Sequence, residues 1–145
     1  MADINSNSTR CGKIVDSSQL DLDINSNSVP QFAYYVPNQN DDGHDTSLST
    51  AMTWFQGWFD ARRNNPNFNT NTLFVIVWDE AVSGGSNQVA CVLYGTPVHP
   101  PSNHQDNTAY NHYSIMATTE KNWNLGNCNK GDVTANAFTR YLVHP

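Results

Sequence analysis

The feature that most constrains the fold is the run of six apolar residues at 73–78, which shows no alternation of apolar and polar positions. A strand with one solvated face alternates, whereas a strand covered on both faces is apolar throughout. The run at 89–94 has the same character, and the aromatic and β-branched segment at 31–36 is typical of another strand. Because sheets covered on both faces are usually parallel, these segments predict a mostly parallel sheet.

A helix is expected between the strands at 31–36 and 73–78. Its apolar positions recur at intervals of four, three and four residues, and they are Leu48, Met52, Phe55 and Phe59. That spacing defines one face of a helix, which Asp45 or Thr46 can cap and which Pro66 stops. Strand, helix and strand make a βαβ unit, and further helices are expected at 109–123 and 132–142.

The expected architecture is an α/β fold, a three-layer α/β/α sandwich on a mostly parallel sheet, in a single domain of 145 residues. Residues 1–30 are polar and are expected to form a loosely structured segment before it. A net charge of -6 argues against nucleic acid as a partner, and no apolar stretch approaches the length of a membrane span. The glycosylation sequon Asn7-Ser8-Thr9 favours an extracellular location, although residues 1–10 lack the pattern of a signal peptide.

Three cysteines are too few for a disulfide scaffold. Cys91 lies within the apolar run at 89–94 and is expected to be a buried free thiol. This leaves Cys11 and Cys128 as the two that can pair.

Polar residues follow two of the expected strands directly. In open α/β sheets ligands bind beyond the carboxyl ends of the strands, so the loops after residues 36 and 78 are the candidate sites. Asp79 and Glu80 can hold a divalent cation or simply begin a polar loop. His44 can donate to a phosphate oxygen or serve a structural role beside a helix cap, and His112 can do the same or pack between tyrosines.

These motifs, taken in order, resemble the C-terminal part of the fungal phosphoesterases, the acid phosphatase and phospholipase C-like group of the alkaline phosphatase superfamily. The resemblance runs from about Arg10 to Phe138 through Val29-Pro30-Gln31, Pro37-Asn38, Asp42-Gly43-His44-Asp45-Thr46, Asn65-Pro66-Asn67-Phe68, Trp78-Asp79-Glu80, Tyr110-Asn111-His112-Tyr113-Ser114 and Asn122-Trp123. It implies that Asp79 and Glu80 bind a catalytic metal. It also implies that His44 and His112 surround the phosphoryl group.

The chain departs from that family in one respect. Family members carry an additional N-terminal half with an acidic-Asn metal pair and a Ser or Thr nucleophile, and no segment of residues 1–30 resembles either. Phosphoryl transfer through a covalent intermediate requires such a nucleophile. The family's sheet also continues into that half, so an exposed sheet edge and a homodimer formed across it are expected here.

Two functions are therefore predicted. The first is a non-catalytic, lectin-like protein without a cofactor that binds a glycan or a small phosphorylated ligand, because sugar sites combine amide, carboxylate and aromatic groups. Its expected contacts are Asn38, Asn40, Asp42, His44, Tyr110, Asn111, His112 and Tyr113. The alternative is a metal-dependent acid phosphatase or phosphodiesterase, complete or in need of the N-terminal half. His99, His104 and His144 are expected to be surface residues.

Overall fold

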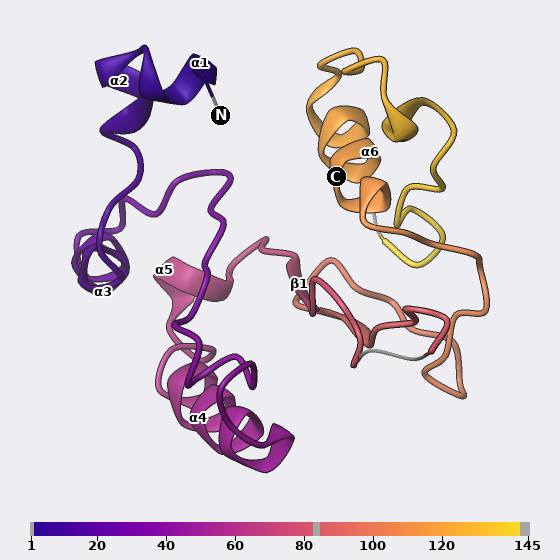
Figure 1. Ribbon diagram of the computed structural model, residues 1–145, viewed down its shortest axis with the longest axis horizontal. Coiled ribbons are helices and arrows are strands. Elements are labelled where there is room, and N and C mark those ends of the chain that lie inside the picture. Colours follow the sequence, from indigo (N-terminus) through magenta and orange to yellow (C-terminus); the bar gives the residue numbers. More distant parts are fainter. Residues whose placement is uncertain (1, 83–84, 143–145) are drawn as a thin grey trace. The chain divides into compact units, whose positions relative to one another are not determined.

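The computed structural model describes residues 2–82 and 85–142 (Figure 1). Contacts between residues divide the chain into two compact units, Met1–Thr70 and Asn71–Pro145. The single domain stays a prediction, because compact contact units need not be separate domains. Within the described residues no helix is long and apolar enough to cross a membrane.

The first unit is helical. It contains α1 (Ala2–Asn5), α2 (Ser8–Cys11), α3 (Ser18–Asn25), α4 (Leu48–Asp60) and α5 (Pro66–Asn69). Its core includes Ile24, Ala51, Phe59 and Phe68, each no more than 9% exposed. The N-terminal 30 residues, expected to be loosely structured, thus carry three short helices, of which α3 contributes to this core through Ile24.

Two contacts hold α3 to the segment after α4. The Arg62 guanidinium donates to both carboxylate oxygens of Asp21, each at 2.8 Å. Asn67 Nδ2 of α5 donates to the Ile24 carbonyl oxygen at 2.9 Å. The Arg62 guanidinium also lies over the Trp58 ring, 5.0 Å from its centroid, so one side chain joins both helices.

The second unit combines a hairpin-like sheet with one longer helix. Strands β1 (Phe74–Val77) and β2 (Cys91–Tyr94) pair antiparallel, with Phe74 opposite Tyr94 and Val77 opposite Cys91. Helix α6 (Tyr113–Trp123) follows, and the 3-10 turn η1 (Gly131–Val133) contacts it. Figure 1 shows the C-terminal segment, in yellow, folded back beside α6.

Phe138 anchors that C-terminal segment to α6. Its side chain is 4% exposed, and its backbone N–H donates to Thr118 Oγ1 of α6 at 2.8 Å. The Thr118 hydroxyl in turn donates to the Ser114 carbonyl oxygen one helical turn earlier, at 2.6 Å. The end of the described chain is also tied to the segment after β2, because His99 N–H donates to the Tyr141 carbonyl oxygen at 2.7 Å.

The predicted three-layer α/β/α sandwich with a mostly parallel sheet is wrong. The sheet of the described residues has two strands only, and they run antiparallel. Residues 31–36 form no strand, and 132–142 form no helix beyond η1. The prediction of a strand covered on both faces failed at β2, where Val92 is 51% exposed. An apolar run indicates a strand, but it does not determine how many of the strand's faces are covered or in which direction the neighbouring strand runs.

Several local predictions were also wrong. Ser47 caps α4 by accepting from Thr50 N–H at 3.2 Å, whereas the Thr46 hydroxyl donates to the Asn40 carbonyl oxygen. The helix expected at 109–123 begins only at Tyr113. Cys91 is a free thiol as expected, but it is exposed and not buried. Cys11 and Cys128, which were expected to be able to pair, are also free and exposed.

Candidate functional site

The contact that defines the site joins the end of β1 to the start of α6. The Nε2 atom of His112 lies 3.0 Å from the carbonyl oxygen of Trp78, the residue that directly precedes Asp79. A carbonyl oxygen only accepts, so Nε2 carries the proton and Nδ1 is the ring atom left for a ligand. Because the peptide unit is planar, this bond also orients the peptide from which Asp79 departs.

The position of His112 depends on how α6 begins. Asn111 Oδ1 accepts from Tyr113 N–H at 2.9 Å, and Asn111 N–H donates to Ser114 Oγ at 3.1 Å. The two bonds resemble a capping box, except that the Asn111 side chain accepts from Tyr113 N–H and not from Ser114 N–H, and Ser114 is fully buried. His112 therefore lies in the first helical turn, where its backbone is already helical, with φ -60° and ψ -27°.

Both tyrosines near His112, Tyr110 and Tyr113, contact other residues of the same unit. Tyr110 Oη donates to Asp106 Oδ2 at 2.7 Å, and its ring centroid lies 4.7 Å from that of Phe138. Burial, together with the hydrogen bond to Asp106, raises the pKa of Tyr110 above 10. The Tyr113 ring lies against the backbone of Gly131, where an added Cβ would come within 2.4 Å of it.

Asp79 and Glu80 are exposed, and within the part of the chain that the structure describes no hydrogen bond or ion pair engages either carboxylate. Mg²⁺ is often held by one or two carboxylates together with substrate phosphates. No group of three or more His, Cys, Asp or Glu residues suited to a metal ion occurs among residues 2–82 and 85–142. Metal binding by Asp79 and Glu80 therefore stays a prediction, and we assign no chemical step to a metal.

His44 belongs to the first unit, where a polar loop precedes α4. Asn38 organises this loop, because its Oδ1 accepts from the N–H groups of Asn40 and Asp41 at 2.9 and 3.1 Å. Asp42 Oδ1 accepts from the backbone N–H of His44 at 2.8 Å, and the His44 side chain is exposed. Of the predicted contacts, Asn38 and Asp42 thus serve as loop supports.

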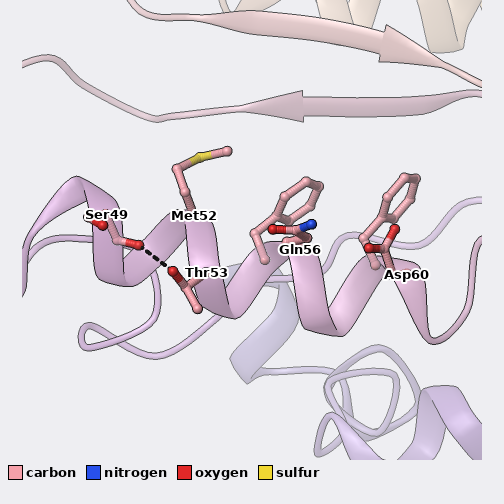
Figure 2. Close-up of a pocket in the computed structure, with 7 residues that line it drawn as sticks. Ser49, Met52, Thr53, Gln56 and Asp60 are labelled. Carbon is pink, nitrogen blue, oxygen red and sulfur yellow. Dashed lines mark hydrogen bonds between the residues drawn. The ribbon is translucent and has the colours of Figure 1, made fainter.

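A shallow groove follows one face of α4 (Figure 2). It is lined by Ser49, Met52, Thr53, Phe55, Gln56, Phe59 and Asp60. All of these residues belong to the helix itself, and Figure 2 shows the bond by which the Thr53 hydroxyl donates to the Ser49 carbonyl oxygen. None of the predicted site residues lines this groove, so it is not a candidate active site.

The residues that support His112 were not predicted from the sequence, and they are Asp106, Ser114, Thr118 and Phe138. Two of them had a signal in the sequence. Asn111 and Ser114 are three residues apart, the spacing of a capping box, and Asp106 precedes Thr108 as in an Asx turn. His99 and His104 are exposed as expected, and His144 lies outside the described residues.

The structure thus brings a histidine at a helix start to the strand end that Asp79 and Glu80 follow, and both residue types can act in general acid–base catalysis. Comparison with known proteins gives the class directly. Residues 2–126 match the phosphoesterase family, and the chain belongs to that family. The resemblance to phosphoesterases inferred from the sequence motifs is confirmed.

The individual relatives are mostly fungal acid phosphatases. The chain is 32% identical over 135 residues to an acid phosphatase of Aspergillus fumigatus, and 31% identical over 134 residues to a probable acid phosphatase of Kluyveromyces lactis. These alignments cover 92% and 91% of this chain but 30% and 32% of those proteins. The chain thus spans about a third of the length of these curated relatives.

A bacterial relative has a more specific name. The chain is 31% identical over 97 residues to a phosphatidylinositol-3-phosphatase of Mycobacterium tuberculosis, which covers 67% of this chain and 31% of that protein. No solved structure matches the chain.

Proposed function

We propose that this chain carries part of the active site of a phosphoric ester hydrolase of the acid phosphatase kind, with His112, Asp79 and Glu80 at the phosphate group. The observation that carries the proposal is the 3.0 Å contact between His112 Nε2 and the Trp78 carbonyl oxygen, which brings the histidine to the strand end where the carboxylates begin. Membership of the phosphoesterase family and the acid phosphatase relatives support it.

The donors and acceptors at this site suit a phosphate monoester that keeps a proton. Below its second pKa of about 6 a phosphate monoester keeps one P–OH group, which can donate to a carboxylate. A doubly protonated His112 ring offers Nδ1–H to another phosphate oxygen, because Nε2–H already donates to Trp78. A charge-assisted hydrogen bond of this kind is roughly twice as strong as a neutral one, so the ring would stabilise negative charge on the phosphoryl group.

Glycan binding stays a prediction that no observation favours. Several polar groups expected to bind a sugar hold their own loops together, since Asn38 caps its turn, Asn111 caps α6 and Tyr110 donates to Asp106. These atoms would have to exchange an internal hydrogen bond for one to a ligand. Binding above background on an array of immobilised glycans would support the lectin-like function. The extracellular location also stays a prediction.

Hydrolysis of p-nitrophenyl phosphate tests the proposal, measured from about pH 4 to about pH 7 across the second phosphate pKa. The assay is run with and without added Mg²⁺, Mn²⁺ and Zn²⁺, and bis-p-nitrophenyl phosphate separates diesterase from monoesterase activity. We expect turnover that falls by roughly 100-fold or more in His112→Asn, the effect of losing a positioned proton donor.

His104→Asn is the matched control. His104 is exposed and adopts φ 53°, a left-handed conformation that Asn tolerates well, so this variant should keep wild-type turnover. Absence of turnover by the wild-type chain with every metal, or equal activity of His112→Asn and His104→Asn, would contradict the proposal.

A further inference from the structure

We propose that Asp106 is a positioning residue for His112: its carboxylate fixes the turn at 106–110, and that turn sets where the His112 ring lies against the Trp78 carbonyl. The Asp106 carboxylate contacts Thr108, Tyr110 and Arg140, and its proposed effect on His112 is through the backbone. The inference rests on the proposed function for its catalytic consequence, although the geometry that it describes can be measured without any activity.

The Asp106 carboxylate accepts three hydrogen bonds from the segment that leads to His112. Its Oδ1 accepts from Thr108 N–H at 3.0 Å and from the Thr108 hydroxyl at 2.7 Å, and its Oδ2 accepts from Tyr110 Oη at 2.7 Å. Arg140 adds a cation 3.7 Å from Oδ1. One ionised side chain therefore fixes both a backbone turn and the direction of an aromatic ring.

The ionised state of this carboxylate is favoured by the same contacts. Burial alone would raise the pKa of Asp106, but the hydrogen bonds from Thr108 and Tyr110, with the charge of Arg140, hold it below the ordinary value of 3.8. Asp106 is therefore an acceptor for all three bonds throughout the pH range in which a phosphate ester would be hydrolysed. Hydrogen bonds to a charged acceptor are worth more than neutral ones.

The ring of Tyr110 carries this constraint to α6. It packs on Phe138, whose backbone N–H donates to Thr118 Oγ1, and the Thr118 hydroxyl donates to the Ser114 carbonyl oxygen. Phe138, Thr118 and Ser114 are buried, and the last of these contacts lies in the first turns of α6. The turn at 106–110 is thus linked through Phe138 to the buried side of α6, whereas His112 lies on the exposed side of the helix start.

A second attachment fixes the backbone of the turn at Ala109. Asn136 Nδ2 donates to the Ala109 carbonyl oxygen at 2.9 Å. The residue after Tyr110 is Asn111, whose capping bonds begin α6, so only one peptide unit separates the fixed turn from the cap. His112 is held from both sides, and its exposed ring has a defined place beside Trp78 because the backbone beneath it is fixed.

The test measures the ring directly, by NMR of the chain labelled with ¹⁵N at its five histidines, with His112→Asn identifying the His112 signals. In the wild type the two ring nitrogens should report the Nε2–H form, as the acceptor at Trp78 requires. We expect Asp106→Ala to move both shifts toward those of free histidine, and Tyr110→Phe, which removes one of the three bonds, to move them less.

Asp16→Ala is the matched control, because Asp16 also accepts from a backbone N–H two residues on, at 2.9 Å to Ser18, but lies in the first unit. It should leave the His112 shifts unchanged. Asp106→Asn is included because it keeps the Oδ1 acceptor for Thr108 and preserves the fold if the alanine variant unfolds. In the phosphatase assay we expect kcat of Asp106→Ala to fall about 10- to 100-fold, the effect of a displaced catalytic group.

The two readouts separate the positioning role from the enzymatic function. His112 shifts that stay at their wild-type values in folded Asp106→Ala, or in Tyr110→Phe if the alanine variant unfolds, would overturn the positioning role, whatever the activity. Shifts that move in a chain without turnover would support the positioning role and contradict the phosphatase. Shifts and kcat that change together would support both.

Discussion

Thr118 provides the sharpest test of how the C-terminal segment is attached to α6, through the substitution Thr118→Val. Valine has nearly the shape of threonine but lacks the hydroxyl. The substitution removes the acceptor of the buried Phe138 N–H, at 2.8 Å, and the donor to the Ser114 carbonyl oxygen, at 2.6 Å. Because Thr118 is 9% exposed and Phe138 is 4% exposed, water has little access to the group left unpaired.

The expected effect is dominated by that unpaired N–H group. A buried donor without a partner costs about 1–3 kcal/mol, whereas the Ser114 carbonyl lies in a helix and can keep its backbone partner. We therefore expect Thr118→Val to lower the opening free energy of the segment around Phe138 by about 2 kcal/mol. That corresponds to roughly 30-fold faster exchange of the Phe138 amide proton, at 1.4 kcal/mol for each tenfold.

Native-state hydrogen exchange is the appropriate assay, because it reports local opening within one unit of the chain. Thr118→Ser is the control, since it keeps the hydroxyl and loses only the methyl group. Its amide protection at Phe138 should exceed that of Thr118→Val. Equal protection in the two variants, or greater protection in Thr118→Val, would refute the account of Phe138 as an anchor that depends on this hydroxyl.

Three further predictions follow from the same unit. Asn111→Ala should destabilise the first turn of α6 by about 1 kcal/mol, seen as faster amide exchange there than in Asn111→Asp, which keeps a capping oxygen. Wild type should exceed Asp106→Asn in stability above pH 3.8, and this advantage should vanish in urea titrations as the pH falls through the lowered pKa of Asp106. Light scattering should give about twice the mass of 16.2 kDa if a sheet edge mediates a dimer, as predicted, and the mass of one chain would exclude it.

The sequence predicted the existence of α4, because periodicity marks a helix without reference to its partners. Of the four apolar positions, Phe59 is buried, whereas Leu48 and Met52 are 64% and 43% exposed. The cap was misassigned by one or two positions because Ser47, Thr46 and Asp45 are all competent residues, and the loop before them decides which is used. Thr46 donates to Asn40 and Asp45 N–H donates to Gln39, so Ser47 remains for the helix.

The sheet could not be derived in the same way. Two apolar runs at 73–78 and 89–94 predicted strands that exist as β1 and β2, but the direction in which they pair depends on the path of the 78–90 segment. The segment at 31–36 has the composition of a strand, yet a strand exists only where a neighbour supplies hydrogen bonds. Composition alone therefore overestimated both the number of strands and their parallel order.

The candidate site was predicted in part. His112 was chosen for its motif, and the structure brings its ring to the Trp78 carbonyl just after β1, while its role at a phosphate stays a prediction. The supporting roles of Thr118 and Phe138 were not predicted, because Phe138 contacts Thr118 across 20 residues of sequence and contacts Tyr110 from a still more distant position. Such pairs carry no local pattern, and only the folded chain reveals them.

The bond between His112 and the Trp78 carbonyl also limits how the imidazole can handle protons. With Nε2–H donated to this carbonyl, Nδ1 is the ring atom through which a proton can be exchanged with a ligand. The ring need not rotate to present Nδ1, so a single fixed orientation beside the strand end would be enough.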